Sequence, residues 1–272
     1  MPTLLESYDD YERIEEAFLA RLDESLNPRG PDFFYEVMAG LGLPEGASAL
    51  DVGCGAGKQS LELARRFGFS VLGIDPVPSH VDESSARRDE AAQSDARLRD
   101  LLRFEAGTAQ AISLPDASVD LVLCREVLVL VDAIEQAFAE CRRVLKPGGR
   151  MLIYQIFPTE RLESSDEALL AGMSGPKAAG SDRARFEEAF ATAGLVAEQR
   201  IELASEGGEY FEEQSGEGSR RLLHAARLLR APDRYVAEFG QQAYEIMLGD
   251  AMWHVFRMIG KQSAWVYVLR AG

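Results

Sequence analysis

Short, mostly apolar runs alternate with stretches of helical periodicity along the middle of the chain. The run from Ser48 to Val52 ends in a glycine-rich turn, and residues 59–67 continue with the spacing of an amphipathic helix. The same alternation predicts strands at 70–74, 102–106, 119–124, 151–157, 196–203 and 264–269, and helices at 81–101, 132–145 and 183–193. Because strands that alternate with helices form a parallel sheet covered on both faces, the pattern predicts an α/β fold.

The two ends of the chain follow a different pattern. Apolar positions recur at three- and four-residue steps from residue 4 to residue 26, which predicts an amphipathic helix, and a second helix is expected after Pro31. A polar, glycine-containing linker is expected from Pro158 to about Asp182. Residues 218–229 and 232–259 have helical spacing and follow an acidic loop at 205–218. We therefore predict three parts, namely an N-terminal helical segment (1–45), a central domain (46–203 with 264–272) and a helical lid inserted at 204–263.

Composition and charge narrow the classes of partner and compartment. The formal charge of −16 opposes binding to nucleic acid or to an anionic membrane, because both attractions come mainly from lysine and arginine. No apolar stretch approaches the roughly 18 residues that span a bilayer, and the acidic N-terminus is unlike a signal peptide, so we expect a cytoplasmic protein. The three cysteines have no metal-like spacing, which predicts buried thiols and no metal site.

A glycine-rich loop carries the main chemical signal. Gly53, Gly55 and Gly57 occupy alternate positions between a strand and a helix, where bare backbone lets a ligand approach closely. The next strand ends in Asp75, whose carboxylate can accept hydrogen bonds from the two hydroxyls of a ribose. Together these features predict an adenosine-containing ligand.

Two ligands meet that description, a dinucleotide and S-adenosylmethionine. The dinucleotide fingerprint requires a third glycine where this chain has Lys58, which disfavours a nicotinamide-dependent oxidoreductase. A pyrophosphate also favours helix N–H groups without a neighbouring carboxylate, whereas Asp51 lies directly before the loop and suits a zwitterionic amino acid. The residues therefore favour S-adenosylmethionine.

Four segments in order, DVGCGAG, LGIDP, GTAQAISLPDASVDLV and RVLKPGG, resemble the successive motifs of class I S-adenosylmethionine-dependent methyltransferases. The resemblance covers roughly residues 48–157. It implies a Rossmann-like, seven-stranded, mostly parallel sheet whose last strand is antiparallel, with helices on both faces and a helical cap. The predicted strands at 196–203 and 264–269 agree with that implication.

The resemblance also implies roles for individual residues. Gly53 and Gly55 would line the methionine part of the donor, Asp75 would bind the ribose, and Pro76 would lie beside the adenine. The positions expected to contact the cofactor are Tyr11, Asp51, Gly53, Cys54, Gly55, Asp75, Pro76, Thr108, Ala109, Gln110, Cys124 and Arg125. Family members often have Asp at the position of Thr108, and a hydroxyl is the weaker acceptor for the adenine amino group.

The chemistry at the acceptor is less clearly marked in the sequence. Many small-molecule members carry a histidine shortly after the fourth strand, where this chain has Val129 and Leu130. Glu126 is the carboxylate best placed to take the acceptor's proton, although it could equally bind the donor's ammonium group or a backbone turn. His254 on the lid is the second candidate base, against the alternative of a structural histidine. His80 is interpreted as a solvated turn residue.

The leading functional hypothesis is methyl transfer to oxygen or nitrogen of a small molecule such as a specialised metabolite. Methylation of a protein or peptide is an alternative within the same fold. A further alternative is a non-catalytic regulatory protein that binds S-adenosylmethionine or S-adenosylhomocysteine, and a homodimer is left open.

Overall fold

The computed structural model describes residues 14–174 and 182–272, and within them the strands form a seven-stranded sheet in the order β3-β2-β1-β4-β5-β7-β6. The strands are β1 (Ser48–Val52), β2 (Ser70–Asp75), β3 (Leu102–Ala106), β4 (Val119–Arg125), β5 (Leu145–Pro158), β6 (Leu195–Ala204) and β7 (Gln262–Ala271). Strands β1 to β5 pair in parallel, and β7 is antiparallel to both β5 and β6. The predicted Rossmann-like sheet with an antiparallel last strand is confirmed.

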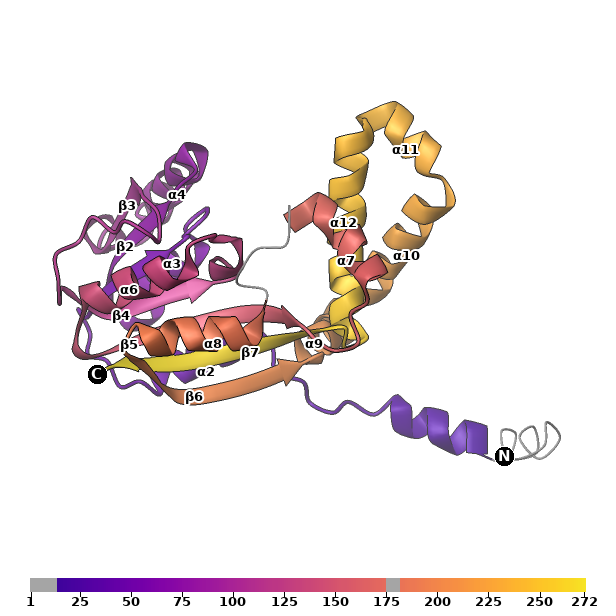
Figure 1. Ribbon diagram of the computed structural model, residues 1–272, viewed down its shortest axis with the longest axis horizontal. Coiled ribbons are helices and arrows are strands. Elements are labelled where there is room, and N and C mark those ends of the chain that lie inside the picture. Colours follow the sequence, from indigo (N-terminus) through magenta and orange to yellow (C-terminus); the bar gives the residue numbers. More distant parts are fainter. Residues whose placement is uncertain (1–13, 175–181) are drawn as a thin grey trace.

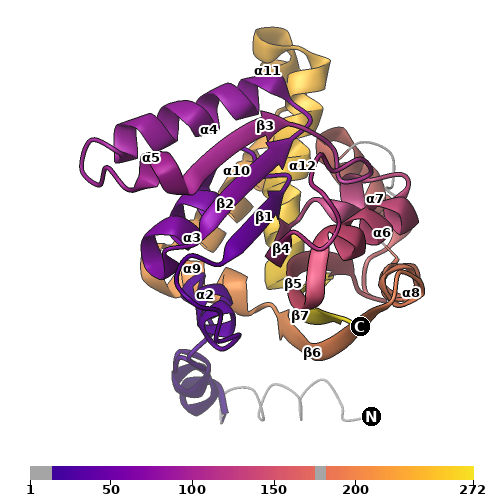
Figure 2. The same cartoon turned by 90° about the vertical axis from the view of Figure 1, so that its left-hand side faces the viewer.

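Helices cover both faces of this sheet (Figures 1 and 2). They are α2 (Asp32–Ala39), α3 (Lys58–Phe67), α4 (Pro78–Ala91), α5 (Leu98–Leu101), η1 (Leu128–Leu130), α6 (Ile134–Val144) and α8 (Arg183–Thr192). Buried side chains of α6 and α8 form one apolar cluster with the sheet, and those of α2, α3 and α5 form a second cluster. In the first cluster, the rings of Phe138 and Phe186 meet edge to face with centroids 5.1 Å apart. The two-sided core explains why the central strands are mostly apolar on both faces.

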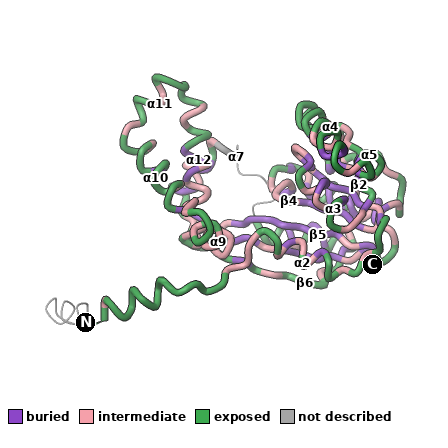
Figure 3. The backbone as a smooth tube through the Cα atoms, turned by 180° about the vertical axis from the view of Figure 1, so that it is seen from behind, coloured by how far each residue is buried: buried purple, intermediate pink, exposed green. Residues whose placement is uncertain are grey.

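Four helices between β6 and β7 make up what we call the lid, and they project to one side of the sheet (Figure 1). The lid consists of α9 (Glu206–Ser215), α10 (Glu217–Arg230), α11 (Pro232–Phe239) and α12 (Gln241–Met258). Helix α7 (Ser164–Ser174) packs against α12. Figure 3 shows that burial is concentrated in the sheet, whereas much of the lid is exposed. The domain boundaries proposed from the sequence stay a prediction.

Two segments expected to lack structure are helical, so those predictions are wrong. The expected linker after Pro158 contains α7, where Gly172 lies so close to α12 that an added Cβ would be 2.6 Å from the Glu245 carbonyl oxygen. The expected loop at 205–218 contains α9, whose first turn holds Glu206 in an ion pair with Arg29 at 2.5 Å. In both cases tertiary contacts stabilise a helix that the local composition does not favour.

Two predicted helices are each divided. The helix expected at 81–101 is split into α4 and α5, and the one at 232–259 is split into α11 and α12 at Gly240, which has φ of 86°. At the N-terminus, residues 14–22 are helical and extend away from the sheet (Figure 1), while residues 4–13 of the predicted helix lie outside the described residues. Among the described residues, no helix is both long enough and apolar enough to cross a bilayer.

Candidate functional site

The loop between β1 and α3 has the backbone geometry that its glycines predict. Gly53 and Gly55 have φ angles of 70° and 51°, in the left-handed region where a side chain is strained. A Cβ at Gly53 would lie 2.3 Å from Val127 Cγ2, so the turn after β4 packs directly on this loop. Bare backbone is therefore required at Gly53 both by conformation and by packing.

Asp51 is the second-last residue of β1, directly before the glycine loop, and is almost fully buried, with 2% of its surface exposed. Its Oδ2 accepts a hydrogen bond of 2.6 Å from the Ser60 hydroxyl on α3. Burial raises the pKa of Asp51 to about 6, against smaller opposing effects of the Ser60 hydrogen bonds. A buried carboxylate that is costly to ionise is stabilised by a nearby cation, such as the ammonium group of an amino acid.

Asp75 ends β2 and joins the glycine loop to α4. Its Oδ2 accepts from the Gly55 backbone N–H at 2.9 Å, and its Oδ1 accepts from the Val77 N–H at 2.9 Å. The Nδ1 atom of His80 lies 3.1 Å from the same Oδ1. These contacts fix the orientation of the carboxylate, and Oδ2 keeps a lone pair for a further donor.

His80 and Ser60 are site residues that the sequence reasoning missed. The His80 side chain is 46% exposed, as predicted, but it lies in the first turn of α4, with its ring nitrogen against Asp75. The spacing of five residues from Asp75, across a strand end and into a helix, was the signal available in the sequence. Ser60 was discernible only as a small polar residue on the apolar face of α3.

The adenine-side positions follow β2 and β3. Pro76 is exposed directly after β2, and Thr108 is exposed in a tight turn after β3, where it forms a bridge with Ala111. Ala109 is buried in the core, whereas the carbonyl of Gln110 accepts from the Gln136 side chain at 3.0 Å. The turn therefore presents the Thr108 side chain to solvent at the carboxyl edge of the sheet.

Cys54 and Cys124 lie beside the site but point away from solvent. Both thiols are free and buried, with exposures of 5% and 0%. Burial raises the pKa of Cys54 to about 12, so its thiol stays protonated. The predicted buried state of the cysteines is confirmed.

The end of β4 meets β5 and the lid. Glu126 has a positive φ of 56°, which is uncommon for a residue other than glycine, and its N–H donates to the Tyr154 carbonyl at 2.9 Å. Burial raises the pKa of Glu126, and the positive charges of Arg257 and Arg125 oppose that effect. The strained backbone and the burial together mark Glu126 as a candidate functional residue.

Two arginines surround Tyr154 on β5. Arg125 lies 5.1 Å from the centre of the Tyr154 ring, and Arg257 of α12 donates from Nη2 to the Tyr154 hydroxyl at 2.9 Å. Arg257 also stacks over Trp253 at 4.7 Å. The lid thus supplies a cation to the same corner of the sheet that holds Glu126.

The two remaining predicted residues are His254, on α12, and Tyr11. His254 contacts its own helix, with its ring 4.9 Å from that of Trp253 and its Nε2 3.9 Å from Asp250 Oδ1. Burial and Arg221 lower its pKa, which favours the neutral imidazole. Its role as a base stays a prediction. Tyr11 lies outside the described residues.

The donor residues predicted from the sequence therefore gather at the carboxyl ends of β1, β2, β3 and β4. This edge is where open α/β sheets bind their ligands. Residues 50–153 match the family model described as a methyltransferase domain. These residues are a methyltransferase domain. The family predicted from the four sequence motifs is thereby confirmed.

Curated relatives match about half of this chain. Sterol 24-C-methyltransferase ERG6B of Gibberella zeae is 32% identical over 126 residues, which make up 46% of this chain and 32% of that protein. O-methyltransferase resE of Aspergillus sclerotiorum is 32% identical over 155 residues, or 57% of this chain and 51% of that protein. The chain thus spans between about a third and about half the length of these relatives.

Solved structures extend the likeness in fold beyond the methyltransferase domain. Geranyl diphosphate C-methyltransferase from Streptomyces coelicolor, in complex with geranyl diphosphate and S-adenosylhomocysteine, has a TM-score of 0.64 at 19% identity. It covers 88% of this chain, and this chain covers 78% of it. The [4+2]-cyclase SpnF has a TM-score of 0.63 at 18% identity, with coverage of 99% of this chain and 96% of that chain. The fold is therefore shared with proteins of different named activities.

Proposed function

We propose that this chain binds S-adenosylmethionine and transfers its methyl group to oxygen or nitrogen of a small molecule. The observation that carries the proposal is the contact between Asp75 and the Gly55 backbone N–H, which couples a ribose-binding carboxylate to the glycine loop. The family of the methyltransferase domain supports the same donor, as does the S-adenosylhomocysteine held by the Streptomyces coelicolor neighbour.

The donor is expected to lie across the carboxyl ends of the central strands. Asp75 would accept from the ribose hydroxyls, and the backbone at Gly53 and Gly55 would line the methionine part. Asp51 provides a buried negative charge for the donor's ammonium group. Pro76 and the turn at 108–110 would border the adenine.

Methyl transfer depends more on the alignment of the donor with the acceptor than on catalytic side chains. The donor supplies an electrophilic methyl carbon bonded to a sulfonium. As the acceptor's oxygen or nitrogen bonds to that carbon, the carbon–sulfur bond breaks and S-adenosylhomocysteine is released. Holding the two reactants in line supplies much of the rate. Glu126 takes the acceptor's proton in this proposal, because its raised pKa brings it nearer to neutral pH than an exposed glutamate.

The surroundings of Glu126 suit a small acceptor. Arg257 and Trp253 reach this corner from α12, and Trp253 packs against the buried cluster on that side of the sheet. An acceptor bound there would be enclosed between sheet and lid, which excludes water from the transfer. A folded protein or peptide acceptor is the alternative substrate class.

A second candidate function is donor-dependent ligand binding without methyl transfer. It is favoured by the turn at η1, where Val129 and Leu130 replace a histidine base and the Leu130 side chain is 60% exposed. The shared fold of the [4+2]-cyclase is compatible with this alternative. In that case, Glu126 would orient a ligand and would take no proton from it.

Calorimetric titration tests the donor first, with S-adenosylhomocysteine as ligand and NAD as control. The proposal expects binding of S-adenosylhomocysteine alone, and binding that is lost or strongly weakened in Asp75→Ala. A panel of hydroxyl and amine acceptors with methyl-labelled donor then tests transfer. Binding without transfer to any acceptor would favour the second candidate, and absence of binding would overturn both.

A further inference from the structure

A cavity of about 500 Å³ lies within the lid, between α10, α11 and α12. Its wall contains no residue of the sheet or of the glycine loop. The sheet-facing side of α12 carries Trp253 and Arg257, which contact the core, while Met247 and Ala251 of the same helix line the cavity. The cavity is therefore separate from the donor site and from the corner at Glu126.

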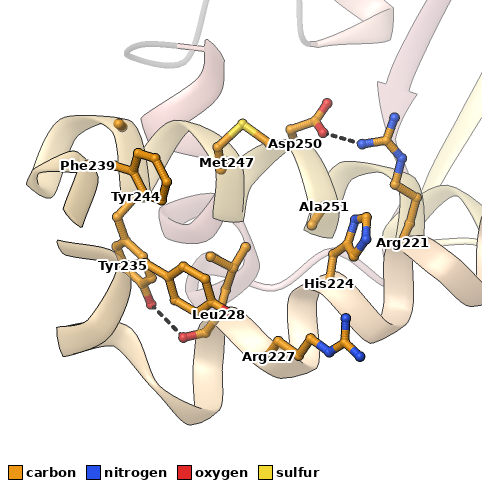
Figure 4. A pocket seen from close by; sticks show the side chains of 11 residues that line it. Arg221, His224, Arg227, Leu228, Tyr235, Phe239, Tyr244, Met247, Asp250 and Ala251 are labelled. Carbon is orange, nitrogen blue, oxygen red and sulfur yellow. Dashed lines mark hydrogen bonds and ion pairs between the residues drawn. The ribbon is translucent and has the colours of Figure 1, made fainter. Parts of the chain in front are cut away.

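The two ends of the cavity differ in chemistry, as Figure 4 shows. One end is built from the aromatic rings of Tyr235, Phe239 and Tyr244. Phe239 is 62% exposed and Met247 is 52% exposed, so these apolar side chains are not covered by the protein itself. Cavities of a few hundred Å³ with aromatic walls are typical sites for small ligands with an apolar body.

The other end is cationic. Arg221 and Arg227 face it together with His224, and Asp250 is the acidic side chain on this wall. Asp250 is already paired with Arg221 at 2.6 Å, and Arg221 is also 3.4 Å from Glu217. Within the described part of the chain, no ion-pair partner is recorded for Arg227. The wall therefore retains a positive charge at Arg227 after its internal pairs are formed.

This local charge contrasts with the rest of the molecule. Helix α10 has the sequence EGSRRLLHAARLLR, with four arginines and one glutamate, in a chain whose formal charge is −16. General attraction would bring cations to such a protein, so an anion would be held only where arginines cluster. The cavity combines that cluster with an apolar wall.

We propose that the lid cavity is a binding site for an amphiphilic anion, a molecule with an apolar chain or ring system and one carboxylate, sulfonate or phosphate group. The apolar part lies against Tyr235, Phe239 and Tyr244, and the anionic group pairs with Arg227. The site operates independently of the proposed methyl transfer.

Dodecanoate and dodecyltrimethylammonium, both kept well below their micellar concentrations, test the proposal by calorimetry on the full chain. They share an alkyl chain of equal length and carry opposite charges. We expect saturable binding of dodecanoate, and weaker binding of the cation despite the negative charge of the protein. Binding of the cation with equal or greater affinity would overturn the assignment of an anion site.

Two matched arginine substitutions on α10 test which positive charge binds the anionic group. Arg227→Gln removes the cavity arginine, whereas Arg230→Gln removes an arginine of the same helix that does not line the cavity. Loss of one partly solvated charge contact is expected to weaken dodecanoate binding about fivefold in Arg227→Gln and to leave Arg230→Gln near wild type. Equal effects of the two substitutions would overturn the site.

A third variant and two further titrations test where the apolar part of the ligand binds. Ala243→Phe places a ring in the cavity and is expected to abolish dodecanoate binding while the midpoint of urea unfolding stays near wild type.

Dodecanoate affinity is expected to be unchanged with saturating S-adenosylhomocysteine, because the sites are separate. Competition between the two ligands would place the anion in the donor site. Binding to anionic phospholipid vesicles without binding of monomeric dodecanoate would show a membrane-docking surface and overturn the cavity site.

Discussion

The substitution Asp51→Asn is expected to stabilise the protein in the absence of donor while it weakens donor binding. The Asp51 carboxylate is buried under the glycine loop, and burial raises its pKa to about 6 from an ordinary value of 3.8. An asparagine of the same shape keeps an oxygen to accept from Ser60 and carries no charge to desolvate.

The expected magnitude follows from the difference between those two pKa values. Since the folded-state pKa is the higher one, the native protein binds more protons than the unfolded chain, and stability falls as pH rises through about 6. Relative to the unfolded chain, the Asp51 carboxyl group costs about 3 kcal/mol of stability at about pH 7.5, and roughly half as much at about pH 5. Asp51→Asn should recover most of this cost at each pH.

Urea unfolding of both proteins without ligand, at about pH 5 and about pH 7.5, measures the effect. The gain in stability from Asp51→Asn should be roughly twice as large at the higher pH as at the lower one. Asp120→Asn serves as a control, because Lys146 and Ser48 hold the pKa of Asp120 below its ordinary value and this substitution should destabilise.

Donor binding provides an independent check of the same carboxylate. If the donor's ammonium group pairs with Asp51, binding of S-adenosylhomocysteine near pH 6 should release a proton, because the cation favours the ionised carboxylate. Titrations in buffers of different ionisation enthalpy detect that proton. A gain in stability that is absent, or that is equal at both pH values, would refute the argument from burial.

Three further predictions concern neighbouring parts of the site. Asp75→Ala should weaken S-adenosylhomocysteine binding by about 1.5 to 3 kcal/mol in calorimetry, and His80→Ala by less, since His80 acts on the donor only through Asp75. Glu126→Gln should lower kcat without changing donor affinity and should remove the rise of rate with pH that ionisation of Glu126 produces; an unchanged pH profile would exclude it as the base. Gly53→Ala should destabilise the fold by about 1 to 3 kcal/mol in urea unfolding, and Val127→Ala should relieve part of that loss; an unaltered midpoint for Gly53→Ala would contradict the positive φ and the close packing.

Sequence pattern alone was sufficient where an element is buried on both sides. The central strand Ser48–Val52, which is buried along most of its length, has the predicted bounds, because a short apolar run between turn residues has few other stable placements. The order of strand ends also placed Asp51, Asp75 and Glu126 on one edge of the sheet, since parallel strands bring their carboxyl ends together.

The local sequence pattern led to wrong predictions where a helix is stabilised by residues far away in the chain. Helices α7 and α9 are polar enough to resemble loops, and they are helical beside α12 and Arg29 respectively. Those partners lie far away in the chain, so the local sequence pattern does not reveal them. The same limit applies to Gly240, where a left-handed backbone ends one lid helix before the next begins.

The sequence by itself determined the sheet and the glycine loop, because periodicity and backbone restrictions act over a few residues. It also predicted which carboxylates face the donor. Only the tertiary structure decided where polar atoms point and what they meet. It turned His80 toward Asp75, enclosed the Cys124 side chain in the core, and brought Arg257 of the lid to Tyr154 on β5. Such contacts depend on the packing of elements far apart in the chain, and packing is a property of the whole fold.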